Sequence, residues 1–114
     1  MVSFNQVGST GTRQEGSVTR KSATQWRLGE QYIGYLAGIE QMNSRYGTMT
    51  VYVMKDADGE GKLTGKETHL ISSAGLAPLL NQVETGQLVQ LTCSDKNERS
   101  RKVSFNLAVA DMKL

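Results

Sequence analysis

Histidine and cysteine, which often carry catalysis, occur once each among the 114 residues of this chain, as His69 and Cys93. A nucleophilic triad needs a base beside both a nucleophile and an orienting acid, and nothing in the sequence places His69 in such a group. Cys93 alternates with apolar residues of one strand, which indicates a buried and unreactive thiol. We therefore expect no catalytic residues and a protein that is not an enzyme, and we keep an enzyme as the third alternative.

One acidic loop has part of a calcium-binding pattern. It reads DADGEG from Asp56, and a twelve-residue EF-hand loop that began there would place Gly61 at position six and Glu67 at position twelve. Position nine would be Thr64, and the two helices that flank such a loop are missing from the pattern. We prefer the alternative of a solvated turn, and we expect no metal site and no cofactor.

Aromatic and basic residues form a second set with chemical potential. A single strand of nucleic acid needs aromatic faces on which its bases stack and cations along its phosphates. Turns, strands and the basic run RSRK supply both kinds of residue. The candidates for nucleic-acid binding are Tyr52, Tyr46, Arg45, Arg99, Arg101, Lys102, Lys66 and Trp26.

Each candidate has a structural alternative. Tyr52 is expected to point away from the core, but it could serve as a cross-strand packing partner. Trp26 could stack a base or cover an open end of the fold. The run that ends at Lys102 could serve solubility alone. Tyr46 is the most suggestive candidate, because an aromatic residue in a turn has no packing reason to be there.

The elements that must position these residues follow from the spacing of apolar side chains. Alternation with a period of two predicts five strands, over residues 31–42, 48–55, 66–71, 88–93 and 103–109. Leu76, Leu79, Leu80 and Val83 instead follow the stripe of an amphipathic helix of two to three turns. Ser72 or Ser73 could cap this helix, Pro78 fits only its first turn, and Gly86 suits its end.

This order of elements is that of an all-β, five-stranded Greek-key barrel of the OB type, with one short helix between strands three and four. A general α+β sheet with one covering helix is the alternative. Residues 1–24 are polar and contain few large apolar side chains, so we expect a flexible N-terminal arm there. The OB-fold domain would then comprise residues 25–114.

The charge balance gives no bulk attraction for nucleic acid. The net charge is +2, and the expected arm carries all of it, so the barrel sums to zero. Any nucleic-acid partner would therefore be held by a local patch. The sequence has neither an 18-residue apolar run nor the pattern of a signal peptide, and we expect a soluble, intracellular protein.

The segments QYIGYLAGIEQM, RYGTMTVYVM, LAPLLNQVETGQLVQLTC and KVSFNLAVADM resemble the small OB-fold single-stranded-DNA-binding proteins of bacteriophages and plasmids. The resemblance covers about residues 30–112. It implies sequence-independent binding of single-stranded DNA in replication or recombination, as a homodimer or higher oligomer in the cytoplasm of a bacterial host. By position, Tyr46, Tyr52, Arg45, Arg99 and Arg101 would fall on the binding face. The acidic tail of cellular members has no counterpart before the sequence ends in DMKL.

Two functions of different classes therefore compete. The first is binding of single-stranded DNA, with RNA as a further possible ligand. The second is a protein–protein or structural module, as in a virion or replisome, which the neutral barrel favours because nucleic-acid domains are usually more basic.

Overall fold

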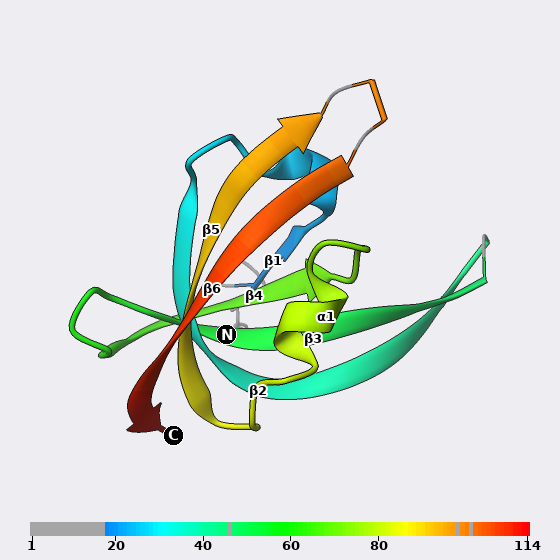
Figure 1. Cartoon of the computed structure of the whole chain (residues 1–114). Coiled ribbons are helices and arrows are strands. Elements are labelled where there is room, and N and C mark those ends of the chain that lie inside the picture. The colour runs from blue at the N-terminus through cyan, green and yellow to red at the C-terminus, as the bar shows by residue number, and fades with distance from the viewer. Residues whose placement is uncertain (1–17, 46, 98, 101) are drawn as a thin grey trace, which may run out of the picture.

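The computed structural model describes residues 18–45, 47–97, 99–100 and 102–114. Nearly all of its regular structure is strand, which confirms the all-β class (Figure 1). The elements in chain order are β1 (Val18–Lys21), the 3-10 turn η2 (Ala23–Gln25), β2 (Gln31–Ser44), β3 (Gly47–Ala57), β4 (Leu63–Ile71), α1 (Ala77–Leu80), β5 (Gln87–Asn97) and β6 (Lys102–Lys113).

The strands form one sheet in the order β1-β4-β3-β2-β5-β6. All neighbours are antiparallel except β1 and β4, which run parallel. The sheet curls strongly (Figure 1), but no backbone ladder joins its two edge strands, β1 and β6, in the described part of the chain. The sheet is therefore not closed.

The β2 strand carries the bend in this sheet. Its pairing with β3 shifts register between Leu36 and Gly38, which is the irregularity expected where a long strand must curl. Gly34 lies on the same strand, and a Cβ atom there would lie 2.8 Å from the carbonyl oxygen of Lys55. Gly34 thus allows close approach of the neighbouring strand β3.

The main core fills the concave side of the curled sheet. Twelve buried residues form it: Trp26, Leu36, Tyr52, Met54, Leu70, Leu76, Leu80, Val89, Leu91, Cys93, Val103 and Phe105. The α1 helix contributes to this core through Leu80, which is fully buried. Phe105, on the last strand β6, is buried as well.

The predicted facing of β3 was wrong. Tyr52 and Met54 belong to the core, with 1% and 0% of their surfaces exposed. The neighbouring Val51 is also buried, at 1%, but lies outside the main cluster. Both faces of this central strand are covered, so alternation of apolar residues did not tell which face is the core.

The N-terminal boundary was also wrong. Residues 18–24 do not belong to a free arm, because β1 pairs with β4 from Val18 opposite Glu67 to Lys21 opposite Leu70. Backbone hydrogen bonds hold this short polar strand, so its low apolar content did not reveal it. Residues 1–17 lie outside the described residues.

The helix is shorter than predicted. It comprises the four residues Ala77–Leu80, with Pro78 in its first turn as expected. Neither Ser72 nor Ser73 caps it, since the N-cap residue is Leu76 and makes no side-chain cap. The turn glycine Gly47 has φ of 111°, as expected for the tight turn between β2 and β3.

Candidate nucleic-acid interface

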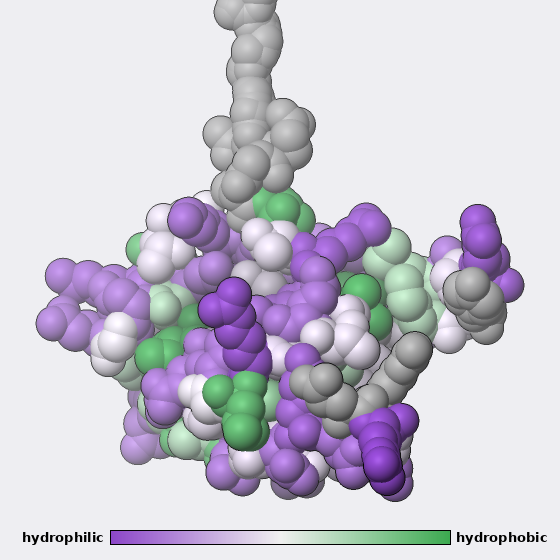
Figure 2. Space-filling view, turned by 90° about the horizontal axis from the view of Figure 1, so that it is seen from above, coloured by the Kyte–Doolittle hydropathy of each residue, from purple (hydrophilic) through white to green (hydrophobic). Residues whose placement is uncertain are grey.

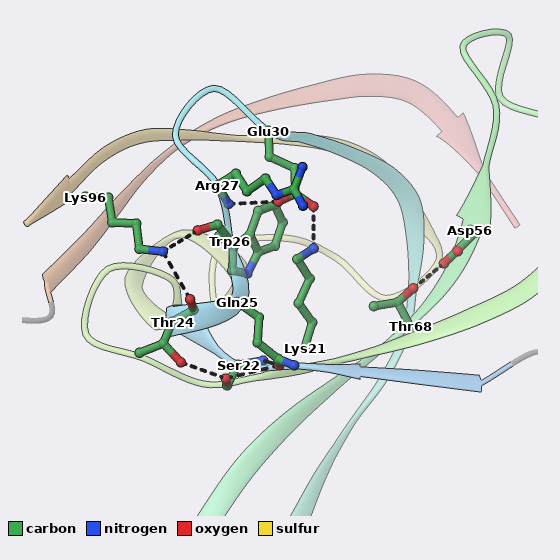
Figure 3. A network of polar contacts seen from close by, with 10 residues as sticks. All are labelled: Lys21, Ser22, Thr24, Gln25, Trp26, Arg27, Glu30, Asp56, Thr68 and Lys96. Carbon is green, nitrogen blue, oxygen red and sulfur yellow. Dashed lines mark hydrogen bonds and ion pairs between the residues drawn. The ribbon is translucent and has the colours of Figure 1, made fainter. Parts of the chain in front are cut away.

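Residues 22–30, here called the strap, run from β1 to β2 and cover one end of the sheet. The Lys96 ammonium on β5 donates hydrogen bonds to the strap carbonyls of Thr24, at 3.1 Å, and Trp26, at 2.8 Å (Figure 3). The Gly29 N–H donates to the carbonyl of Cys93, at 2.8 Å. These contacts fix the strap against the outer half of β5.

Trp26 anchors the strap in the core. Its ring is 1% exposed and meets Phe105 edge-to-face, with 4.9 Å between ring centroids. On its other side the Lys21 ammonium lies 4.8 Å from the ring centroid, a cation–π contact. The sequence candidate Trp26 is therefore a packing residue, and its ring has no surface on which a base could stack.

Lys21 also forms an ion pair with Glu30 at the end of the strap (Figure 3). Partial burial opposes ionisation of this carboxyl, but the hydrogen bond from Lys21 and the Arg27 N–H outweigh it and lower the pKa of Glu30. The ammonium groups of Lys21 and Lys96 thus hold the strap in place. The positive charge that faces solvent at this end of the sheet comes from other residues.

The exposed cations of this end are Arg20 on β1, Arg27 on the strap, and Arg99 and Lys102 at the β5–β6 hairpin. The described residues of the ranges 18–30 and 93–102, here called the positive end, include six lysines and arginines and two acidic residues. Residues 31–92 and 103–114 have the reverse balance, with five cations and seven acids. Figure 2 looks down on the positive end and shows a mostly hydrophilic surface with isolated hydrophobic residues.

The sequence candidates do not gather at one place. Arg45 is exposed at the tip of the β2–β3 hairpin, whereas Arg99 and Lys102 belong to the β5–β6 hairpin, which projects in another direction (Figure 1). Lys66 is exposed on β4, near the β3–β4 hairpin. Tyr46 and Arg101 lie outside the described residues.

Tyr52 is a core residue, in contradiction to its predicted role on the binding face. Its hydroxyl donates to Asn81 Oδ1 at 3.0 Å and so ties β3 to the end of α1. The other described aromatic rings are also buried or partly buried, namely those of Trp26, Tyr32, Tyr35 and Phe105. Among the described residues, no exposed aromatic ring is available for base stacking.

Arg27 and Leu28 were not among the candidates predicted from the sequence. Both are exposed, Leu28 by 67%, beside a hollow of about 570 Å³ that Lys21 and Glu30 also line. The signal that could have found them is the glycine that follows: Gly29 has φ of 84° and turns the chain directly after these two side chains. A cation and an apolar side chain are thus exposed next to each other at the positive end.

The acidic loop uses its carboxylates within the protein. Asp58 Oδ1 accepts the backbone N–H groups of Lys62, at 2.9 Å, and Glu60, at 2.8 Å, and these bonds lower the pKa of Asp58. Asp56 accepts the hydroxyl of Tyr32 instead, at 2.6 Å. In the described residues, no three potential metal ligands come together.

Asp56 also accepts the Thr68 hydroxyl, at 2.8 Å, so one carboxylate joins β2, β3 and β4 (Figure 3 shows the Asp56–Thr68 bond). Burial, together with this carboxylate, raises the pKa of Tyr32 far above its usual range. His69 lies on the same strand as Thr68, with Nε2 3.2 Å from Glu67 Oε1. The contacts of Asp56 hold the strands together, whereas the contact between His69 and Glu67 lies within β4.

Cys93 is fully buried, and burial raises the pKa of its thiol. No helix within the described ranges has the length and apolar character that crossing a bilayer demands. No protein-family model matches this chain, and comparisons with curated proteins and with solved structures found no match either.

Proposed function

We propose that this protein binds single-stranded nucleic acid, foremost single-stranded DNA in replication or recombination, through its positive end. The observation that carries the proposal is the separation of charge. Arg27, Arg99 and Lys102 face solvent at one end, whereas residues 31–92 and 103–114 contain more acidic than basic residues. Phosphates are drawn to such a patch, and the acidic remainder keeps them from binding elsewhere.

The backbone connections support an OB-type Greek key as the fold behind this site. The first long strand, β2, pairs with β3 on one side and with β5 on the other. β4 continues from β3, and β6 continues from β5. In this proposal, β1 and the strap cover the side on which a closed barrel would join its edges.

Binding would depend more on phosphate contacts than the sequence alone suggested. Each cation that neutralises a phosphate on a single strand releases counterions and adds about 0.7 to the salt slope of the affinity. Leu28 offers an apolar contact for a base or sugar beside Arg27. Base stacking by an aromatic ring is left to Tyr46, which lies outside the described residues.

Titration of a fluorescent oligothymidylate by anisotropy, between about 50 and about 200 mM salt, tests the proposal. Replacing Arg27, Arg99 and Lys102 together by glutamine should lower the salt slope by about 2. A matched control replaces Lys55, Lys62 and Lys66, which are exposed around the β3–β4 hairpin, and should change the slope little. An oligoribonucleotide in parallel separates DNA from RNA.

Absence of binding at the lower salt concentration would refute the function. Equal effects of the two triple variants would refute the location, because the attraction would then come from overall charge alone.

A second candidate function, assembly with another protein chain, rests on β6. This edge strand carries Val109 and Met112, which are 48% and 44% exposed. An unpaired strand edge with apolar side chains is a surface on which another strand can pair, including that of a second copy in a homodimer. Sedimentation of the full chain and of Val109→Lys tests this: a monomer at all concentrations would exclude self-assembly through this edge.

A further inference from the structure

A hollow lies near the turn of the β5–β6 hairpin, between η2, the loop before α1 and the first residues of β6. Its volume is about 310 Å³, roughly ten times the share of one water molecule in the liquid. Its lining includes Ser73, Lys102 and Ser104, and it includes no acidic residue. Hydroxyl and ammonium donors around a space of this size suit an anion.

The hydroxyl of Ser73 has no hydrogen-bond partner. It is the one buried side-chain oxygen or nitrogen without a partner among the described residues. Native proteins rarely leave such a group unpaired, and a missing ligand is one explanation. The Ser73 carbonyl, in contrast, accepts the N–H groups of Leu76, at 3.1 Å, and Ala77, at 2.9 Å. The backbone is therefore held, while rotation about χ1 can turn the hydroxyl towards the hollow.

Gly75 brings the two walls of the hollow together. A Cβ atom at this position would lie 2.0 Å from the carbonyl oxygen of Val103, so only glycine allows this approach. The loop and the edge of β6 thus meet backbone to backbone, which fixes Ser73 on one wall relative to Lys102 on the other.

We propose that this hollow binds a phosphate group, held by the Ser73 hydroxyl and the Lys102 ammonium. The inference rests on the proposed function in one respect: the natural source is a phosphodiester of bound single-stranded DNA. Lys102 belongs to the positive end, so a strand that contacts Arg99 passes the hollow. Free phosphate has the same chemistry and would bind there more weakly.

The test uses the full chain labelled with nitrogen-15. One titration adds inorganic phosphate, a second adds an oligothymidylate without terminal phosphates, and chloride at equal ionic strength is the control. We expect the amide signals of Ser73, Gly75 and Val103 to move with both phosphate sources and not with chloride. Ser73→Ala should weaken phosphate binding about tenfold, as loss of a hydrogen bond to a charged group does.

Ser94→Ala is the matched control, because Ser94 is an exposed serine of β5 outside the hollow. It should leave both titrations unchanged. Ser73→Ala should also keep the melting temperature of the parent, since the hydroxyl loses no internal hydrogen bond. A marked drop in melting temperature would overturn the inference by showing that the hydroxyl has a partner within the fold.

The two proposals fail in different ways. Oligonucleotide binding without movement of the hollow's signals, or with full affinity in Ser73→Ala, overturns the phosphate site and leaves the proposed function standing. Movement with inorganic phosphate but no oligonucleotide binding supports the site and refutes nucleic acid as its source. If neither phosphate source moves these signals, the site is refuted.

Discussion

Replacing Tyr52 by phenylalanine and by alanine separates its two possible roles, core packing and nucleic-acid binding. The ring is 1% exposed and sits in the main core, where β4 places Leu70 directly opposite. Its hydroxyl makes one hydrogen bond, 3.0 Å to Asn81 Oδ1. A core role predicts loss of stability without loss of affinity, and a binding role predicts the opposite.

The structure gives the magnitudes. Tyr52→Phe removes one neutral hydrogen bond, worth about 0.5–1.5 kcal/mol. The lower half of that range is expected, because Asn81 is exposed and water can replace the lost partner. Tyr52→Ala removes a fully buried ring and should cost about 3–5 kcal/mol, a large part of the ~5–15 kcal/mol that stabilises a typical domain.

Urea unfolding followed by circular dichroism measures the free energy of unfolding, and anisotropy measures oligonucleotide binding under native conditions. For Tyr52→Phe we expect a slightly lower midpoint and an affinity within about twofold of the parent, since no contact at the positive end changes. Unchanged stability combined with tenfold weaker binding would refute the core role and return Tyr52 to the interface.

Three further substitutions test the framework of the site. Glu30→Gln removes the ion pair with Lys21. Because the pKa of Glu30 is lowered in the folded state, the stabilisation by this carboxylate is present above about pH 4.5 and is lost as pH falls. The stabilities of the parent and the variant, measured against pH, should therefore converge at low pH, and a constant difference between them would contradict this. Asp56→Ala leaves two buried hydroxyls without their shared acceptor and should cost about 2–4 kcal/mol in urea unfolding; a loss under ~0.5 kcal/mol would show that the strands do not depend on it. Gly75→Ala forces the loop away from Val103 and should lower the melting temperature by several degrees, whereas an unchanged value would contradict the close approach.

The sequence predicted the strands well and their facing poorly, and β3 shows why. Alternation located a strand over residues 48–55, inside the observed Gly47–Ala57, because period-two spacing depends only on local geometry. The face of a strand that packs in the core can be predicted only when the opposite face is exposed and polar. In β3 both Val51 and Tyr52 are buried, so neither face is marked as the core by exposure of the other.

The strap could not be predicted for a related reason. Hydrophobic content located the core segments, but β1 has one large apolar residue, Val18, and is held by its ladder to β4. The contacts that fix the strap join Lys96 to carbonyls about seventy residues earlier in the chain. Every residue has a backbone carbonyl, so the sequence does not show which carbonyls will accept a hydrogen bond from Lys96. Trp26 was the one residue of the strap whose large apolar side chain indicated burial.

The strap also changes what the charge balance of the chain implies for the proposed nucleic-acid binding. Dividing the chain at residue 24 assigned all the positive charge to an arm and left a neutral barrel. In the folded protein, the division that matters is spatial, because the strap brings Arg27 to the same end as Arg99 and Lys102. Electrostatic attraction depends on the field at one end, because charges separated by more than a Debye length of about 8–10 Å are largely screened. A chain with two net charges can therefore present a positive site, provided that a fold holds its cations together.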